Sequence, residues 1–384
     1  MRNDKLLSTV LLTVVTWFSQ AQFGGSEPPD PDKFLRSQTC MTSGCHGGAG
    51  PGKGACNIFS RFDPHFNASA TLTNGRSKAM ARQLGIENAA ESKSCTICHS
   101  PMSQVHSSEI PAHPESHPLA SGVSCASCHG PAENWLLSHT RPDYPKDALA
   151  RLGMRQLGSA YQRANNCVAC HQNLSDELVK AKHPALVFEL DGLLVAEPKH
   201  WREDIGFSNA KTWLVGQAVA LRETAAQATR EPGDRRTAEI EAIKALLKAT
   251  GTGWEDSAKD LVHLADEYAK RISGAAMSRE QSHVMFSKLI ANRAPFQSDA
   301  FEGVTKEYRT WATGYYAERL TLALDRLNQS VITSGQQEVI AKEPLKELFD
   351  AAKPPESFDA STTEEFVLKL DQVAKPHIET DQDR

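Results

Sequence analysis

One short phrase of sequence recurs in the first half of this chain and constrains its fold more than any other feature. Two cysteines separated by two residues, with a histidine directly after the second cysteine, occur three times, as Cys95–His99, Cys125–His129 and Cys167–His171. A fourth copy, Cys40–His46, has four residues between its cysteines. Because eight of the nine cysteines belong to these copies, the group that they bind dominates the structure around them.

This phrase is typical of covalent attachment of haem c. The two cysteine sulfurs add to the two vinyl groups of the porphyrin, and the histidine that follows lies beneath the iron as its proximal ligand. The predicted thioether residues are Cys40, Cys45, Cys95, Cys98, Cys125, Cys128, Cys167 and Cys170. The predicted proximal ligands are His46, His99, His129 and His171. The sequence therefore predicts four covalent haem c groups, each with its iron.

Two other uses of paired cysteines compete with haem. The first two regular copies have spacing that would also suit a tetrahedral zinc site, and disulfides are common outside the cytoplasm. Neither use requires a histidine after the second cysteine in four copies out of four. For the longer copy, Cys40–His46, a disulfide or free thiols remain the alternative. Cys56 has no histidine after it and is predicted to be a buried or free thiol.

The N-terminus predicts export. Arg2 and Lys5 give a positive start, residues 6–18 are apolar, and Ser19 and Ala21 supply small residues for cleavage. The apolar run of thirteen residues is shorter than the roughly twenty that span a bilayer. We expect residues 1–21 to be a signal peptide, leaving no membrane span after cleavage, with an uncleaved anchor as the alternative. The expected location is the periplasm or the outside of the cell.

The rest of the chain divides into regions of different character. Residues 22–33 are rich in Gly, Pro and Ser and predict a linker. Residues 34–205 hold all nine cysteines but few apolar runs, so we expect a haem domain with little regular secondary structure, in which porphyrins serve as core and staples. Residues 206–384 repeat apolar residues at helical spacing and predict an α-helical bundle. The expected fold class is mainly α.

The second axial position of each iron determines what the haems do. A second histidine closes the iron and favours electron transfer, whereas an open position admits a substrate. Seven histidines before residue 201 remain after the four proximal ligands are taken, which is enough to close every iron. They are His65, His106, His113, His117, His139, His183 and His200.

The third copy and its surroundings resemble a known family. Residues 122–134, with His139 ten residues after His129, are similar to the third haem site of tetrahaem cytochromes of the cytochrome c-554 type. The similarity extends over residues 34–201 and includes Asp63-Pro64-His65. These cytochromes are periplasmic electron carriers, so the resemblance implies a multihaem cytochrome c domain with bis-histidine irons.

The same resemblance implies particular axial pairs. His139 would pair with His46, and His65 with His129. For the iron of His171, His183 is the first choice and His200 the second. The second haem of the c-554 type lacks a sixth ligand, but this chain offers candidates for the position opposite His99. These candidates are His200, His106, His113 and His117.

Two functions follow from these expectations. The first is a periplasmic tetrahaem cytochrome that carries electrons between redox partner proteins, with the helical region docking a partner or forming a homo-oligomer. The alternative is a multihaem oxidoreductase that acts on a small nitrogen or sulfur compound at an open His99 haem. No catalytic residue outside the haems is predicted. The net charge of -5 argues against nucleic-acid binding, which favours a basic face.

Overall fold

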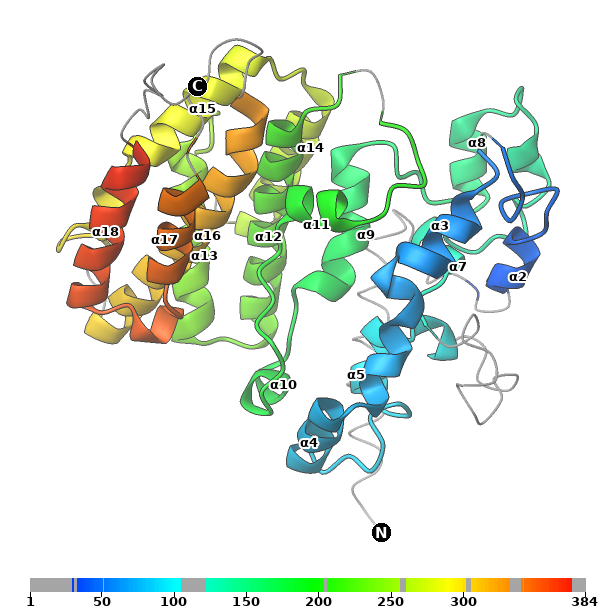
Figure 1. Ribbon diagram of the computed structural model, residues 1–384, viewed down its shortest axis with the longest axis horizontal. Helices are drawn as coiled ribbons and strands as arrows, with labels where there is room; N and C mark the ends of the chain where they lie inside the picture. Colours follow the sequence, from blue (N-terminus) through cyan, green and yellow to red (C-terminus); the bar gives the residue numbers. More distant parts are fainter. Residues whose placement is uncertain are drawn as a thin grey trace, which may run out of the picture. The chain divides into compact units, whose positions relative to one another are not determined.

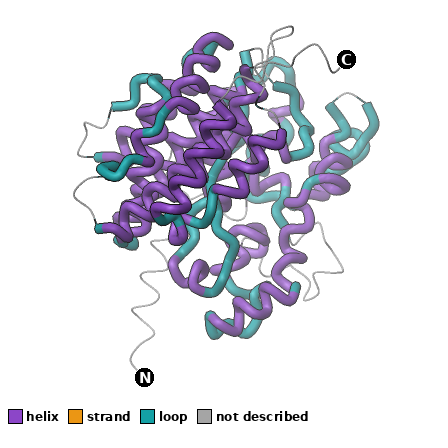
Figure 2. The backbone as a smooth tube through the Cα atoms, turned by 60° about the vertical axis from the view of Figure 1, so that its left-hand side comes forward, coloured by secondary structure: helices purple, strands orange, loops and turns teal. Residues whose placement is uncertain are grey.

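The computed structural model describes residues 30, 33–50, 52–104, 122–203, 206–255, 260–301, 305–331, 340 and 342–374. Over these ranges the chain is mainly α-helical and has no β-strand (Figures 1 and 2). The fold class predicted from the sequence is therefore confirmed. The predicted signal peptide and most of the predicted linker lie outside the described residues.

The described chain forms two compact units. The first contains the residues up to Leu186 together with residues 194–203, and the second contains Val187–Leu193 and the residues from 206 onward. The segment Val187–Leu193, which precedes the boundary expected from the sequence, thus packs with the helical residues that follow it.

The first unit is built from short helices. These are α2 (Ser37–Cys40), α3 (Ala55–Phe62), η2 (Pro64–Thr73), α4 (Gly75–Gln83), α5 (Lys93–His99), η3 (Pro101–Gln104), α7 (Cys125–His129), η5 (Ser138–Thr140), α8 (Lys146–Arg151), α9 (Ala160–His171) and α10 (Asp176–Lys180). Helix α11 (Leu190–Ala196) begins in the second unit and ends in the first.

Buried apolar side chains of the first unit gather in small, separate clusters. Their buried members are Phe34, Met102 and Ala126 in one, Leu72, Ala81 and Ala89 in a second, and Ala132, Trp135 and Leu149 in a third. A domain usually has one contiguous core. Clusters of this size leave the first unit in need of another source of stabilisation, which suits a domain organised around bound porphyrins.

The second unit is a helical bundle with a conventional core. Its helices are α12 (Asn209–Arg230), α13 (Asp234–Ala249), α14 (Leu261–Gly274), α15 (Arg279–Ala291), η6 (Ala294–Phe296), α16 (Lys306–Val331), α17 (Lys342–Ala351), η7 (Pro355–Ser357) and α18 (Ala360–Ala374). Helix α12 packs on α13 and α14, and α16 packs on α13 and α15. Trp213, Leu221 and Tyr316 are completely buried between them. None of the helices in the described ranges has the length and apolar character needed to cross a membrane.

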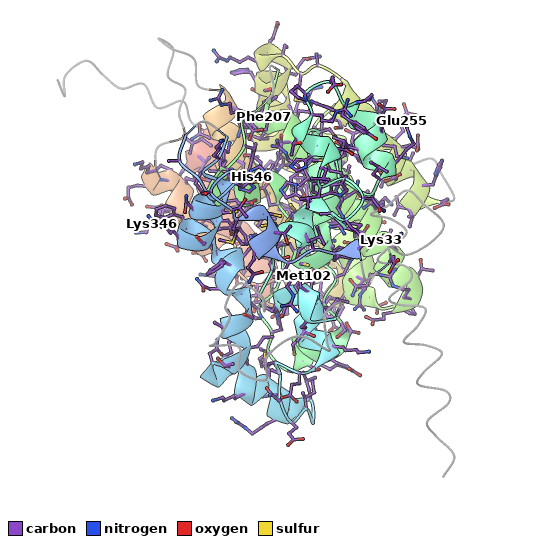
Figure 3. All side chains as sticks on the ribbon, turned by 90° about the vertical axis from the view of Figure 1, so that its right-hand side faces the viewer. Lys33, His46, Met102, Phe207, Glu255 and Lys346 are labelled. Carbon is purple, nitrogen blue, oxygen red and sulfur yellow. The ribbon has the colours of Figure 1, made fainter. Side chains whose placement is uncertain are left out.

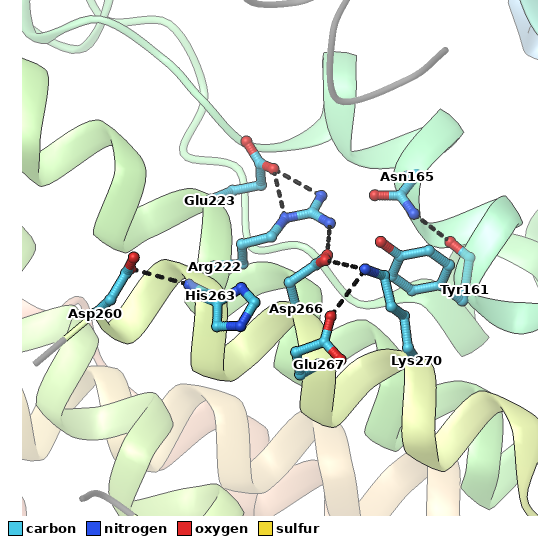
Figure 4. Close-up of polar contacts among 9 residues, drawn as sticks. All are labelled: Tyr161, Asn165, Arg222, Glu223, Asp260, His263, Asp266, Glu267 and Lys270. Atoms are coloured by element: carbon cyan, nitrogen blue, oxygen red, sulfur yellow. Dashed lines mark hydrogen bonds and ion pairs between the residues drawn. The ribbon is translucent and has the colours of Figure 1, made fainter. Parts of the chain in front are cut away.

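Polar contacts on α12 and α14 fix the register of these two helices (Figure 4). The guanidinium group of Arg222 donates to Asp266 at 2.5 Å and to Glu223 at 2.7 Å. Lys270 forms ion pairs with Asp266 at 2.9 Å and with Glu267 at 3.0 Å. Because the Arg222 side chain is only 8% exposed, losing either carboxylate would leave a buried charge with less compensation.

Candidate haem-binding site

Short helices place the three regular copies in a geometry suited to haem. Each copy occupies the last five residues of α5, α7 or α9, and its histidine is the final residue of the helix. Residues three and four positions apart lie on the same face of a helix. Both cysteines and the histidine of each copy therefore face the same side. Serine side chains help to start two of these helices through capping boxes, Ser124 with Ser127 and Ser159 with Gln162.

The longer fourth copy reaches a similar arrangement through a folded loop. The backbone N–H of His46 donates to the carbonyl of Cys40 at 3.1 Å, and that of Cys45 donates to Thr42 at 2.9 Å. These bonds close the four-residue spacer into a turn and return the chain to Cys40. Gly47 completes the turn, because a Cβ atom there would lie 1.9 Å from the carbonyl oxygen of Met41. Figure 3 labels the His46 side chain.

Eight of the predicted axial histidines meet in four pairs. The ring centres are 6.2 Å apart for His46 and His139, 6.4 Å for His99 and His183, 6.3 Å for His129 and His200, and 5.8 Å for His65 and His171. Each pair contains one histidine from a cysteine motif and one from outside it.

These separations fit one metal ion between the two rings. A histidine nitrogen lies about 2 Å from the metal it binds, and the ring centre roughly 1 Å further, so two imidazoles on opposite sides of one iron have centres about 6 Å apart. The four observed distances fall around this value. The residues present therefore suit four bis-histidine haems.

The pairing differs in part from the one that the resemblance implied. The structure brings His139 to His46, as in the implied pair. His65 lies opposite His171 and not opposite His129, and His129 instead faces His200. His183, the first choice for His171, lies opposite His99. The physical reason is the path of the chain, because the partners in all four pairs are 71 to 106 residues apart. His106, His113 and His117 lie outside the described residues.

Hydrogen bonds at Nδ1 define the tautomer of two distal histidines. His183 Nδ1 lies 2.9 Å from the carbonyl oxygen of Pro184, and His65 Nδ1 lies 2.9 Å from the carboxylate of Asp63. A carbonyl or carboxylate oxygen only accepts, so each Nδ1 carries the proton and Nε2 keeps the lone pair that binds a metal. His99 Nδ1 contacts Thr71 Oγ1 at 3.0 Å. Because the Thr71 hydroxyl donates to Ala68, its oxygen accepts from His99.

Burial keeps several of these imidazoles neutral. It lowers the pKa of His129 to about 4, with a smaller contribution from His200, and it lowers the pKa of His171 to about 4, with a contribution from His65. The pKa of His99 is also lowered, first by burial and then by His183. Neutral imidazole is the form that binds iron. Nδ1 of His46, His139 and His200 is buried with no protein partner.

The cysteines carry no competing arrangement. All nine are free of disulfides, and Cys56 is buried. Within the described ranges, one group has the spacing of a metal site, and it consists of Asp63, His65 and Glu197, with no cysteine. The disulfide and zinc alternatives thus find no support in the side-chain geometry.

Sulfurs from different motifs are neighbours. The Cys125 thiol lies within hydrogen-bonding reach of Cys40 and Cys56, and the Cys98 thiol within reach of Cys170. Arg155 joins two motif helices from α7 to α9: its backbone N–H donates to the His129 carbonyl at 3.0 Å, and its guanidinium donates to Asn166 at 2.9 Å. The four motifs therefore form one cluster in place of four separate sites.

Sequence reasoning missed three residues that contact this cluster. Asp63 and Thr71 bind Nδ1 of axial histidines, and Glu197 lies beside Asp63 and His65. The position of Asp63 two residues before His65 was a usable signal. Thr71 and Glu197 carry none, because their positions depend on how the chain folds.

Comparison with known proteins agrees with the site. The family model of cytochrome c554 and c-prime matches residues 39–130, which include three cysteine motifs and His65. Searches of curated proteins and of solved structures give no match. This match supports a c-type cytochrome in electron transfer, with covalent haem c and iron. Its residues 39–130 are of the cytochrome c-554 type, which confirms the resemblance seen in the sequence.

Proposed function

We propose that this chain is a periplasmic tetrahaem cytochrome that carries electrons between redox partner proteins. The observation that carries this proposal is the set of four histidine pairs with ring centres 5.8–6.4 Å apart, one pair for each cysteine motif. Haem c supplies a reversible one-electron iron centre, and the chain supplies two sulfurs and two imidazoles to hold each one.

The closed His99 site favours a carrier over an oxidoreductase. An enzyme of the alternative kind needs a free coordination position for its substrate, and the His99 haem was the candidate. The His183 ring lies opposite His99. Its Nδ1–H donates to the carbonyl oxygen of Pro184, which leaves Nε2 free to bind a metal. With two imidazoles on each iron, electrons move without substrate binding.

Neighbouring sulfurs support electron exchange among the haems. Thioether sulfurs lie at porphyrin edges, so the contacts Cys40–Cys125 and Cys98–Cys170 imply close edges for the first and third haems and for the second and fourth. Close edges favour rapid electron transfer between centres. The neighbouring sulfurs thereby support electron exchange within each of these two pairs of haems. Periplasmic location rests on the sequence of residues 1–21.

Haem counting tests the proposal directly. The pyridine haemochrome spectrum of the purified chain should give four haems per polypeptide, and electron paramagnetic resonance of the oxidised protein should show only low-spin iron. Fewer than four haems would overturn the tetrahaem assignment. A substantial high-spin signal would instead favour a haem that binds substrate. N-terminal sequencing of the protein from a periplasmic fraction should begin after Ala21.

A further inference from the structure

His65 is a distal histidine whose Nδ1 donates to a charged group. The other distal histidines have a neutral partner at Nδ1 or no protein partner there. His65 Nδ1 donates to the Asp63 carboxylate at 2.9 Å. His99 and His183 meet a hydroxyl and a carbonyl oxygen, respectively. Among the eight paired histidines in the described part of the chain, His65 is the one whose ring meets a carboxylate.

Asp63 is held rigidly for this role. Its backbone N–H donates to Phe59 at 3.2 Å and ends α3, while its side chain accepts the backbone N–H of His65 at 2.9 Å and begins η2. Pro64 between them restricts the backbone further. The same carboxylate oxygen therefore serves the backbone and the ring of His65. The Asp63 side chain is 1% exposed, so water does little to screen its charge.

A carboxylate in this position changes the iron. A hydrogen bond from Nδ1–H to a carboxylate makes the imidazole a stronger donor at its other nitrogen. Stronger donation and a nearby negative charge both stabilise ferric iron more than ferrous iron, because the ferric state carries one more positive charge. Hydrogen bonding to axial ligands is one of the means by which proteins set haem potentials.

We propose that Asp63 is a positioning residue that lowers the reduction potential of the His65/His171 haem selectively, leaving the other three haems unaffected. This inference rests on the proposed tetrahaem cytochrome. As a consequence, Asp63 makes the reduction potential of the His65/His171 haem different from the potentials of the neighbouring haems. The His65/His171 haem then accepts an electron later in a reductive titration than it would with a neutral partner at His65.

The test compares the wild-type protein with Asp63→Asn in a potentiometric titration followed by visible and electron paramagnetic resonance spectra. Asparagine keeps an oxygen for the His65 backbone N–H but removes the charge. We expect one of four redox components to shift upward by about tenfold in its equilibrium constant, which is about 59 mV for one electron. That component should be the one missing from a Cys167→Ala/Cys170→Ala variant, which cannot attach the fourth haem.

Three further variants sharpen the result. Asp63→Ser also removes the charge but keeps a small hydroxyl group that can cap η2. It should shift the same redox component, and it serves as a second test in case Asp63→Asn disturbs the fold. Thr71→Val removes the neutral partner of His99 and should shift a different component by less. Asp143→Asn removes an exposed charge of the same unit and should shift none.

The outcomes separate this inference from the proposed function. Fewer than four haems in the wild-type protein would contradict the tetrahaem cytochrome itself. Four haems with no shift in Asp63→Asn and Asp63→Ser, or an equal shift of all components, would overturn the role of Asp63 alone. Loss of the fourth haem from both variants would also overturn it, because Asp63 would then be required for ligation and not for potential.

Discussion

In the proposed tetrahaem cytochrome, His183 is the residue that closes the iron of the His99 haem. We expect His183→Ala to open the sixth position of that iron, because the ring that lies 6.4 Å from His99 is removed. Electron paramagnetic resonance should then show one high-spin ferric haem in four, and cyanide should return it to low spin. His263→Ala, at an exposed position of α14, is the control and should remain low-spin. A fully low-spin His183→Ala protein would mean that a different residue closes this iron.

Glu189 illustrates how burial makes the stability of the folded protein sensitive to pH. Its side chain accepts the backbone N–H of Asp191 at 3.0 Å and that of Gly192 at 2.5 Å. Burial raises its pKa to about 7, and the charge of Asp191 adds to the effect. The ordinary pKa of a glutamate side chain is 4.5. Between this pH and about 7, Glu189 is therefore protonated in the folded protein and ionised in the unfolded chain. Stability consequently falls as pH rises from about 4.5 to about 7 and then levels off.

Glu189→Gln should remove this dependence. Between pH 5 and pH 8, the free energy of unfolding of wild type relative to the variant should decrease by roughly 3 kcal/mol, given about 1.36 kcal/mol per pKa unit. Urea unfolding of the helical unit, followed by far-ultraviolet circular dichroism at both pH values, measures the difference. Glu365→Gln, at an exposed position of α18, should behave as wild type. Parallel pH profiles for wild type and Glu189→Gln would refute the expectation.

At the scale of elements, helix geometry explains how the regular motifs present two cysteines and a histidine on one side without an unusual backbone conformation. Helices α5, α7 and α9 differ in length, but each ends with two cysteines three positions apart and a histidine next to the second. The motif of residues 40–46 lacks this helix and relies on its turn. Substitutions should therefore disturb the geometry of this motif more easily than that of the regular copies.

Two glycines of this turn make a matched test. A Cβ at Gly47 would lie 1.9 Å from the Met41 carbonyl oxygen, which is backbone and cannot move aside cheaply, whereas a Cβ at Gly44 has no neighbour within 4 Å. We expect Gly47→Ala to lower the haem content from four to three per chain and Gly44→Ala to keep four. Pyridine haemochrome and intact mass report the content. Four haems in both variants would show that the turn is not required for attachment.

At the scale of the whole molecule, the two units rely on different sources of stability. Burial of apolar surface stabilises the second unit, where Trp213, Leu246 and Tyr316 are fully buried. In its helix α12, Gly216 allows close packing, because a Cβ there would lie 2.7 Å from Leu190 Cβ. The described residues of the first unit form small, separate apolar clusters. Its order is therefore expected to depend on the haems.

Removal of haem should separate the two units. In chain produced without haem attachment, we expect limited proteolysis to digest residues 34–186 while residues 206–374 persist as a helical fragment. Mass spectrometry identifies the surviving fragment, and circular dichroism reports its helix content. The haem-loaded protein serves as control and should resist cleavage in both units. Equal protection of both units in the haem-free chain would contradict a haem-dependent first unit.

Much of this protein followed from residues close together in sequence. The eight motif cysteines and four proximal histidines are recognisable because attachment needs a fixed local spacing, and the helical bundle is recognisable because its apolar residues repeat at the helical period. Cys56 is not followed by a histidine, so the same local rule excludes it from the motifs, and it is a buried free thiol.

The distal ligands belong to the tertiary structure. His65 and His200 were available from composition, yet their partners are His171 and His129, at separations of 106 and 71 residues. No local rule selects such partners, because every distal histidine has the same chemistry and only the folded path brings two rings to one iron. The sequence by itself thus determined the positions of the attachment motifs, and the fold decided which imidazoles face each other and which carboxylate contacts His65.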